Sequence, residues 1–243
     1  MVAVRGEVGK AGVVPGARRE GAPPLLLVAG LLLLHQLALT LVHFVLAPTL
    51  GIAIMSAGAV ILTIFAASAL MLAIVALDLR QPARARAVFC SKPCWDRATA
   101  GLMLLAFVIA QLPLLYLAVS GKTVWQSGAA SRLAVGQALR GSLSTVSGLG
   151  LLIATVLVAP LVEEVLYRGY LLGGLVVRMP PAVAVAVSAV LFVTLHAEAS
   201  NLIAALCLGV GTAVAAVRTQ SVVPGLVVHV ANNAFGMWYA TLT

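Results

Sequence analysis

Two adjacent carboxylates and an arginine interrupt an otherwise apolar part of the sequence. Glu163, Glu164 and Arg168 lie within the stretch from Ala159 to Gly169. Near the centre of a membrane helix these three charges cost about 7–10 kcal/mol, whereas the apolar residues from Leu149 to Arg168 return only about 3–7 kcal/mol. We therefore expect the charges to meet partners or water inside a helix bundle.

The spacing of these residues assigns one charge partner. Glu164 and Arg168 are four residues apart with the acid first, so they share a helix face. Glu163 lies about 100° away and is left without this local partner. One interpretation is that Glu163 does chemistry. The alternative is a purely structural network of both acids with Arg168, although ionisable residues inside membranes are more often functional.

Two further pairs of polar and aromatic residues have helical spacing. Phe192 and His196 are four residues apart, as are His229 and Asn233, so each pair shares a face. A carboxylate beside an imidazole can activate water, and an imidazole with an amide can donate to a developing oxyanion. We therefore expect Glu163, His196 and His229 to converge in the core of the bundle.

Two histidines and a glutamate are also the ligand set of hydrolytic zinc sites. Glu163, His196 and His229 could hold such an ion, but Asn233 would then have no ligand role. Metal-bound histidines usually hydrogen-bond a carboxylate, and Glu198 is the only other acid near these spans. The sequence therefore favours hydrolysis without a metal or cofactor, with zinc as the alternative.

Composition sets the class of protein that must position these residues. Of the 243 residues, 62% are hydrophobic and 9% are charged, which is typical of polytopic membrane proteins. We predict an all-α bundle of about seven membrane helices, with six to eight as the range. The net charge of +8 does not indicate nucleic-acid binding, because the basic residues lie in the tail and loops. The expected partners are the lipid bilayer and a peptide or membrane-protein substrate.

Apolar runs predict where the membrane helices lie. The fourth run is too long for one straight crossing, so we expect Gly148, Gly150 or Pro160 to break it. Residues 121–141 are mildly amphipathic and predict an interfacial helix. The expected spans are residues 23–47, 51–79, 98–120, 142–178, 182–196, 201–217 and 225–242.

Loop charge predicts the orientation. The polar tail, residues 1–22, carries four Lys or Arg, the loop after the first span carries none, and residues 78–97 carry five. The positive-inside rule then places the disordered tail and the 78–97 loop in the cytoplasm, with Cys90 and Cys94 as reduced thiols. Residues 23–142 form the N-terminal membrane helices with this loop, and residues 143–243 form the core that carries the polar motifs.

Depth in the membrane poses a difficulty for convergence. Counted at 1.5 Å per residue from the cytoplasmic ends, Glu163 and His196 lie about 22 Å deep, whereas His229 lies about 10 Å deep. Straight perpendicular helices would not bring them together. We therefore expect tilt or helix breaks.

The three pairs, in this order, resemble the motifs of the CAAX-processing and abortive-infection (CPBP) family of intramembrane proteases, which includes the prenyl-protein endopeptidases. The resemblance covers about residues 143–243, and the context from Tyr167 to Gly169 also fits. It implies a helical bundle with an intramembrane peptidase site. It implies catalytic roles for Glu163, His196, His229 and Asn233, and supporting roles for Glu164, Arg168 and Phe192.

A second function class is a non-enzymatic membrane protein, such as a proton-coupled transporter, an immunity factor or a scaffold. A transporter should show inverted repeats, and the sequence has none that we detect. A scaffold should tolerate Glu163→Gln. A prenylated CAAX tail is one substrate option, while the Ala-, Val- and Leu-rich composition predicts a bacterial plasma-membrane protein, in which such a tail need not occur.

Overall fold

A computed structural model of the chain describes residues 20–93, 95–120, 145–196 and 202–242. Apart from one isolated bridge between Cys90 and Ser221, the regular structure in these residues is helical, which confirms the predicted all-α bundle. Most of the predicted tail, the predicted interfacial helix and Cys94 lie outside the described residues.

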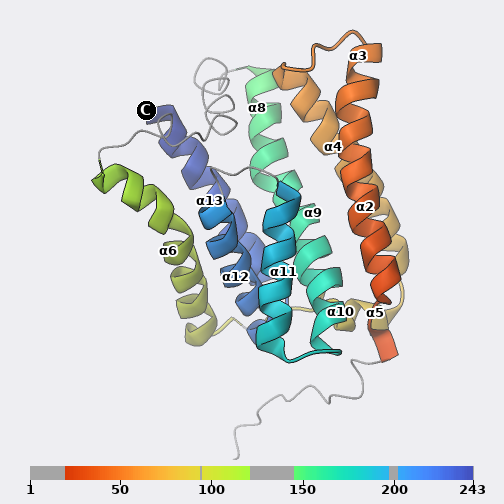
Figure 1. The fold of residues 1–243 in the computed structure, drawn as a ribbon, viewed down its shortest axis with the longest axis vertical. Helices are drawn as coiled ribbons and strands as arrows, with labels where there is room; N and C mark the ends of the chain where they lie inside the picture. Colours follow the sequence, from red (N-terminus) through yellow and green to blue (C-terminus); the bar gives the residue numbers. More distant parts are fainter. Residues whose placement is uncertain (1–19, 94, 121–144, 197–201, 243) are drawn as a thin grey trace, which may run out of the picture.

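The helices follow the apolar runs closely (Figure 1). Two long helices contain π-helical segments, which take one more residue per turn than an α-helix. In chain order the elements are α2 (Leu25–Leu41), η1 (Val42–Leu46), α3 (Ala47–Thr49), α4 (Ala57–Asp78), α5 (Pro82–Ala87), α6 (Arg97–Val119), α8 (Val146–Ile153), η2 (Ala154–Val158), α9 (Ala159–Glu163), η3 (Glu164–Leu171), α10 (Leu172–Val176), α11 (Pro181–His196), α12 (Leu202–Thr219) and α13 (Val223–Leu242).

Length and composition make this an integral membrane protein. Within the described residues four helices are long and apolar enough to cross a membrane, and two shorter helices are also apolar. The long ones are Leu25–Thr49, Ala57–Asp78, Val146–Val176 and Leu202–Thr219, and the shorter ones are Arg97–Pro113 and Pro181–Thr194.

The long helices alternate in direction along the chain (Figure 1). The start of α2, the segment around α5, and the turns after α10 and α12 lie at one end, and the end of α13 lies at the other. The helix from α8 to α10 is central, with α2 and α4 on one side and α11, α12 and α13 on the other. Every residue of its segment Glu164–Leu171 is buried. The charged motif therefore occupies the centre of the bundle.

The predicted break in the fourth span is wrong, because the helix runs uninterrupted over Val146–Val176. Its turns widen instead. In η2 the Ala159 N–H donates to the carbonyl of Ala154, five residues back. Pro160 follows at once, and its missing N–H removes a bond that an α-helix would need. The wider turn accommodates the proline without a kink that would end the helix.

The turn between α12 and α13 is buried beneath the segment that follows α5. Ser221 Oγ donates to the Ser91 carbonyl over 2.7 Å, and Ser91 Oγ donates to the Gln220 carbonyl over 2.6 Å. The Val222 N–H donates to the Phe89 carbonyl over 3.0 Å. Ser221 and Phe89 are both fully buried. Helix α13 therefore begins inside the molecule.

Burial also controls the chemistry of Cys90, which lies in this covering segment outside the membrane helices. Burial raises the pKa of the Cys90 thiol to about 11. A rise of about two units lowers the thiolate fraction at neutral pH about 100-fold, and the thiolate is the reactive form. Cys90 should therefore react slowly on either side of a membrane, which makes it a poor reporter of orientation.

Two engineered cysteines give a cleaner test of the predicted orientation. Gln81 is exposed and its side chain makes no cap bond to α5. Met55 is 95% exposed in the segment that joins α3 to α4, and this segment lies at the end of the bundle opposite α5. In a chain whose three native cysteines are replaced by alanine, an impermeant maleimide should label Met55→Cys in intact cells. It should label Gln81→Cys only after permeabilisation. The opposite pattern would reverse the orientation derived from loop charge.

Candidate functional site

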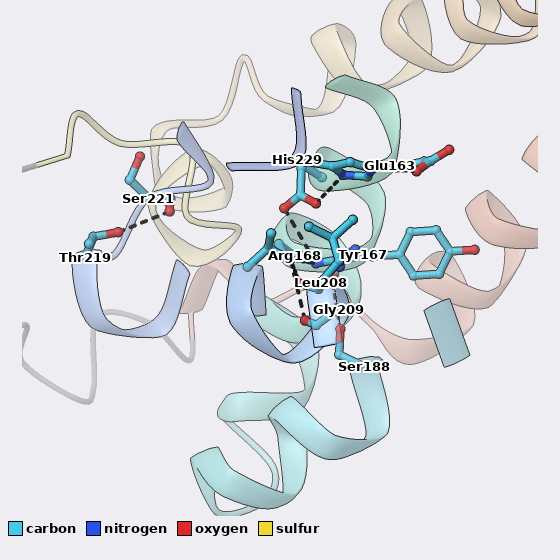
Figure 2. A network of polar contacts seen from close by, with 11 residues as sticks. Glu163, Tyr167, Arg168, Ser188, Leu208, Gly209, Thr219, Ser221 and His229 are labelled. Carbon is cyan, nitrogen blue, oxygen red and sulfur yellow. Dashed lines mark hydrogen bonds and ion pairs between the residues drawn. The ribbon is translucent and has the colours of Figure 1, made fainter. Parts of the chain in front are cut away.

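One imidazole contacts both of the adjacent glutamates, and Figure 2 shows His229 beside Glu163. His229 Nδ1 is 2.9 Å from Glu164 Oε1, and His229 Nε2 is 3.6 Å from Glu163 Oε2. The side chain of His229 is 3% exposed. The expected difference in depth between Glu163 and His229 is therefore wrong, because it assumed that α13 begins at the membrane surface. The buried start of α13 brings His229 to the carboxylates.

The predicted ion pair between Glu164 and Arg168 is confirmed. Arg168 Nε lies 3.5 Å from Glu164 Oε2, and both side chains are fully buried. The same Nε donates to Thr212 Oγ1 over 2.7 Å. Glu164 therefore holds two partners, Arg168 on its own helix and His229 on α13, which fixes its position more firmly than the local pair alone.

Sequence reasoning missed Thr212, and the surrounding small residues explain its position. Thr212 is a fully buried hydroxyl in α12. A Cβ atom on Gly225 would lie 2.9 Å from Glu164 Oε2 and 3.2 Å from Thr212 Cβ. Only glycine lets the start of α13 approach this closely, as small residues do between membrane helices. The sequence signal that could have identified Thr212 is a hydroxyl side chain among glycines and alanines.

Phe192 lies against the charged groups from α11. Its ring centroid is 4.1 Å from Arg168 Cζ, within the range of a cation–π interaction. The ring also meets Tyr167 and His229 edge to face, with centroids 5.2 and 5.9 Å away. Phe192 is 1% exposed. The ring packs over the guanidinium, which has no hydrogen bond from Nη1 or Nη2 among the described residues.

Asn233 lies one turn beyond His229, as the spacing predicts. Its Nδ2 donates to the Thr155 carbonyl over 3.1 Å, and its Oδ1 accepts from Asn232 Nδ2 over 3.2 Å. His196 is the last residue of α11, and its side chain lies outside the described part of the chain. The predicted pairing of His196 with Glu163 therefore stays a prediction.

Exposure distinguishes the two glutamates. The side chain of Glu163 is 17% exposed, whereas that of Glu164 is 0% exposed and bound by Arg168. Only Glu163 combines contact with the imidazole and access to solvent. The carboxylates and the guanidinium together leave one negative charge, which a proton on His229 would balance.

The donor set also bears on the zinc alternative. Among the described side chains, no group of three or more His, Cys, Asp or Glu is arranged to hold a metal ion, and the third predicted ligand, His196, is not among them. The expected lack of a supporting carboxylate is wrong, because Glu164 hydrogen-bonds His229 Nδ1. Metal-bound histidines are commonly supported in this way. Zinc held by Glu163, His196 and His229 therefore needs a direct test.

Comparison with known proteins bears on this part of the chain. Residues 145–235 match the family model described as Rce1-like, type II CAAX prenyl endopeptidase Rce1-like. No curated protein and no solved structure matches the chain. The matched residues contain all of the predicted catalytic and supporting residues. The match makes residues 145–235 similar to this family, in agreement with the resemblance that the three motifs indicated.

Proposed function

We propose that this protein is an intramembrane endopeptidase that hydrolyses a peptide bond with an activated water molecule. The observation that carries the proposal is the single imidazole held between two glutamates, one solvent-accessible and one fully buried, in an Rce1-like region. The Rce1-like match supports a peptidase of the CAAX type at the level of the family. The roles of individual residues follow from their contacts.

Glu163 is the proposed general base. It is the carboxylate with access to water, and it is not the one that neutralises Arg168. In the proposed step Glu163 takes a proton from water as the oxygen attacks the peptide carbonyl, and the same proton then passes to the leaving amine. His196 is proposed as its partner in holding the water, on the motif position alone.

His229 and Asn233 are proposed to stabilise the oxyanion. Glu164 accepts from Nδ1 and so fixes the plane of the imidazole, which leaves Nε2 on the side of Glu163. A doubly protonated imidazole would donate to Glu164 from one nitrogen and to the oxyanion from the other. Asn233 uses one amide hydrogen on the Thr155 carbonyl and keeps a second for the oxyanion. Donors fixed in this way need no reorganisation during the reaction.

The substrate proposed is a peptide or a membrane protein that reaches the site from the bilayer. A prenylated CAAX tail is the class suggested by the family description. Residues 143–243 are the proposed catalytic core, and the bacterial plasma membrane with a cytoplasmic N terminus is the proposed setting. The proposal uses no metal. If zinc is present, Glu163, His196 and His229 would hold it, and it would supply Lewis-acid activation of water.

The test is a comparison of new protein N-termini in cell membranes. Cells that express the wild-type chain should contain at least one cleavage product that is missing from cells with Glu163→Gln, because glutamine cannot take a proton from water. Glu20→Gln, at an exposed position near the tail, is the matched control and should retain the product. Identical N-termini in the wild-type and Glu163→Gln membranes would instead favour a non-enzymatic role.

A further inference from the structure

A row of three side-chain amides leads from α6 to the central helix. Gln111 Nε2 donates to Asn232 Oδ1 over 2.9 Å, and Asn232 Nδ2 donates to Asn233 Oδ1 over 3.2 Å. Asn233 Nδ2 then donates to the Thr155 carbonyl over 3.1 Å. Gln111 lies outside the Rce1-like residues 145–235, so the match says nothing about this contact.

The π turn explains why the Thr155 carbonyl, at the end of the row, has no main-chain donor and can accept from Asn233. In an α-helix this carbonyl would accept from the N–H of Ala159, but in η2 that N–H donates to Ala154 instead. In the wider π-helical register the next donor would be residue 160, which is a proline and has no N–H. The π turn and Pro160 together leave one main-chain acceptor, which Asn233 occupies.

This carbonyl fixes the direction of the whole row, because it can only accept. The nitrogen of Asn233 must therefore face Thr155, and its oxygen must face Asn232. By the same reasoning the nitrogen of Asn232 must face the oxygen of Asn233. The oxygen of Asn232 must then accept from the nitrogen of Gln111. The Gln111 Oε1 is buried and has no hydrogen bond among the described residues, so the Gln111 amide is held through its Nε2 bond to Asn232.

We infer that Gln111 and Asn232 are positioning residues that hold the Asn233 amide in the orientation needed to donate to the oxyanion. The catalytic role in this inference rests on the proposed function, whereas the orientation of the Asn233 amide does not depend on it. An asparagine amide that turns over by 180° would present an oxygen where a donor is required. The row prevents this because a rotated amide would place its oxygen against a neighbouring oxygen and its nitrogen against a neighbouring nitrogen, and would lose its hydrogen bonds.

The composition of the chain makes the orientation directly measurable. The chain contains three asparagines, Asn201, Asn232 and Asn233. Protein labelled with ¹⁵N only in asparagine side chains should therefore give three NH2 signal pairs by NMR, which Asn201→Ala and Asn233→Ala would assign. Gln111→Met removes the first donor at nearly constant volume. It should shift the Asn233 pair and speed its hydrogen exchange by about tenfold or more.

The matched control is Leu112→Met, one residue along α6 at a side chain that is 49% exposed. It should leave the Asn233 pair unchanged. If Gln111→Met does not fold, Asn232→Asp keeps the shape but places an oxygen against Asn233 Oδ1, and should move the same signals. An Asn233 pair that is unchanged in a folded Gln111→Met or Asn232→Asp protein would overturn the inference.

A kinetic measurement separates this inference from the proposed function. With a farnesylated CAAX peptide as the probe, Gln111→Met should lower kcat about tenfold and leave KM unchanged, since loss of a whole oxyanion donor costs about 10²–10³. A rise in KM with unchanged kcat would overturn the positioning role. A wild-type protein that cleaves no peptide would contradict the proposed function, while the NMR signals would still decide whether the row orients Asn233.

Discussion

Replacing Glu164 with glutamine should lower the free energy of unfolding by about 3–5 kcal/mol, the usual cost of removing one partner from a buried ion pair. Glu164 and Arg168 are both fully buried, and Arg168 Nη1 and Nη2 have no hydrogen bond among the described residues. The arginine would keep Thr212 but lose its counter-charge. Unfolding in detergent, followed by helical circular dichroism against added SDS, measures the change.

Glu163→Gln is the matched control, because it makes the same chemical change one residue away. Glu163 keeps partial access to solvent and does not neutralise Arg168, so this variant should lose much less stability than Glu164→Gln. It should also lose turnover. A Glu164→Gln protein that is stable and inactive, beside an active Glu163→Gln protein, would reverse the roles assigned to the two glutamates.

Replacing Asn233 with alanine should lower kcat about 10²–10³-fold with little change in KM, as removal of an oxyanion donor does. An oxyanion forms only during the reaction, so its donor contributes more to the rate than to substrate binding. The proposed mechanism also predicts that the wild-type rate survives strong chelation. Kinetics of the purified protein on a peptide substrate, with and without chelator, measure both effects.

Metal analysis provides the contrary outcome. One tightly bound zinc per chain that is lost together with activity in His196→Ala would contradict the metal-free mechanism. The control is His43→Ala, because His43 lies in η1 and its Nδ1 is 3.2 Å from Thr63 Oγ1. Zinc retained in His43→Ala and lost in His196→Ala would assign the ion to the site.

The bundle and one contact of the site could be predicted from short-range patterns. Apolar runs of sufficient length have few stable forms in a membrane other than helices, so the spans followed from composition. The pair of Glu164 and Arg168 followed from a spacing of four residues. Each of these predictions depends on one segment alone, which is why the sequence was sufficient.

The contact between Glu164 and His229 could not be predicted in this way. It depends on where α13 begins, and that is decided by the packing of residues 88–91 over the turn at Ser221, about 130 positions away in the chain. Thr212 and Gln111 were missed for a related reason. The partner of a single polar residue in an apolar helix can be predicted only when the rotation of each neighbouring helix is known.

The π-helical segment η2 accommodates one more residue than the corresponding α-helical turn would. Deleting Val156, Leu157 or Val158 would let that turn close to an α-helix, because the Ala159 N–H would then donate to the carbonyl four residues back, which is still Ala154. Glu163 and Glu164 would keep their orientation relative to α8 and would stay beside the imidazole. Gene variants that lose one codon here should therefore be less damaging than substitution of the acids themselves.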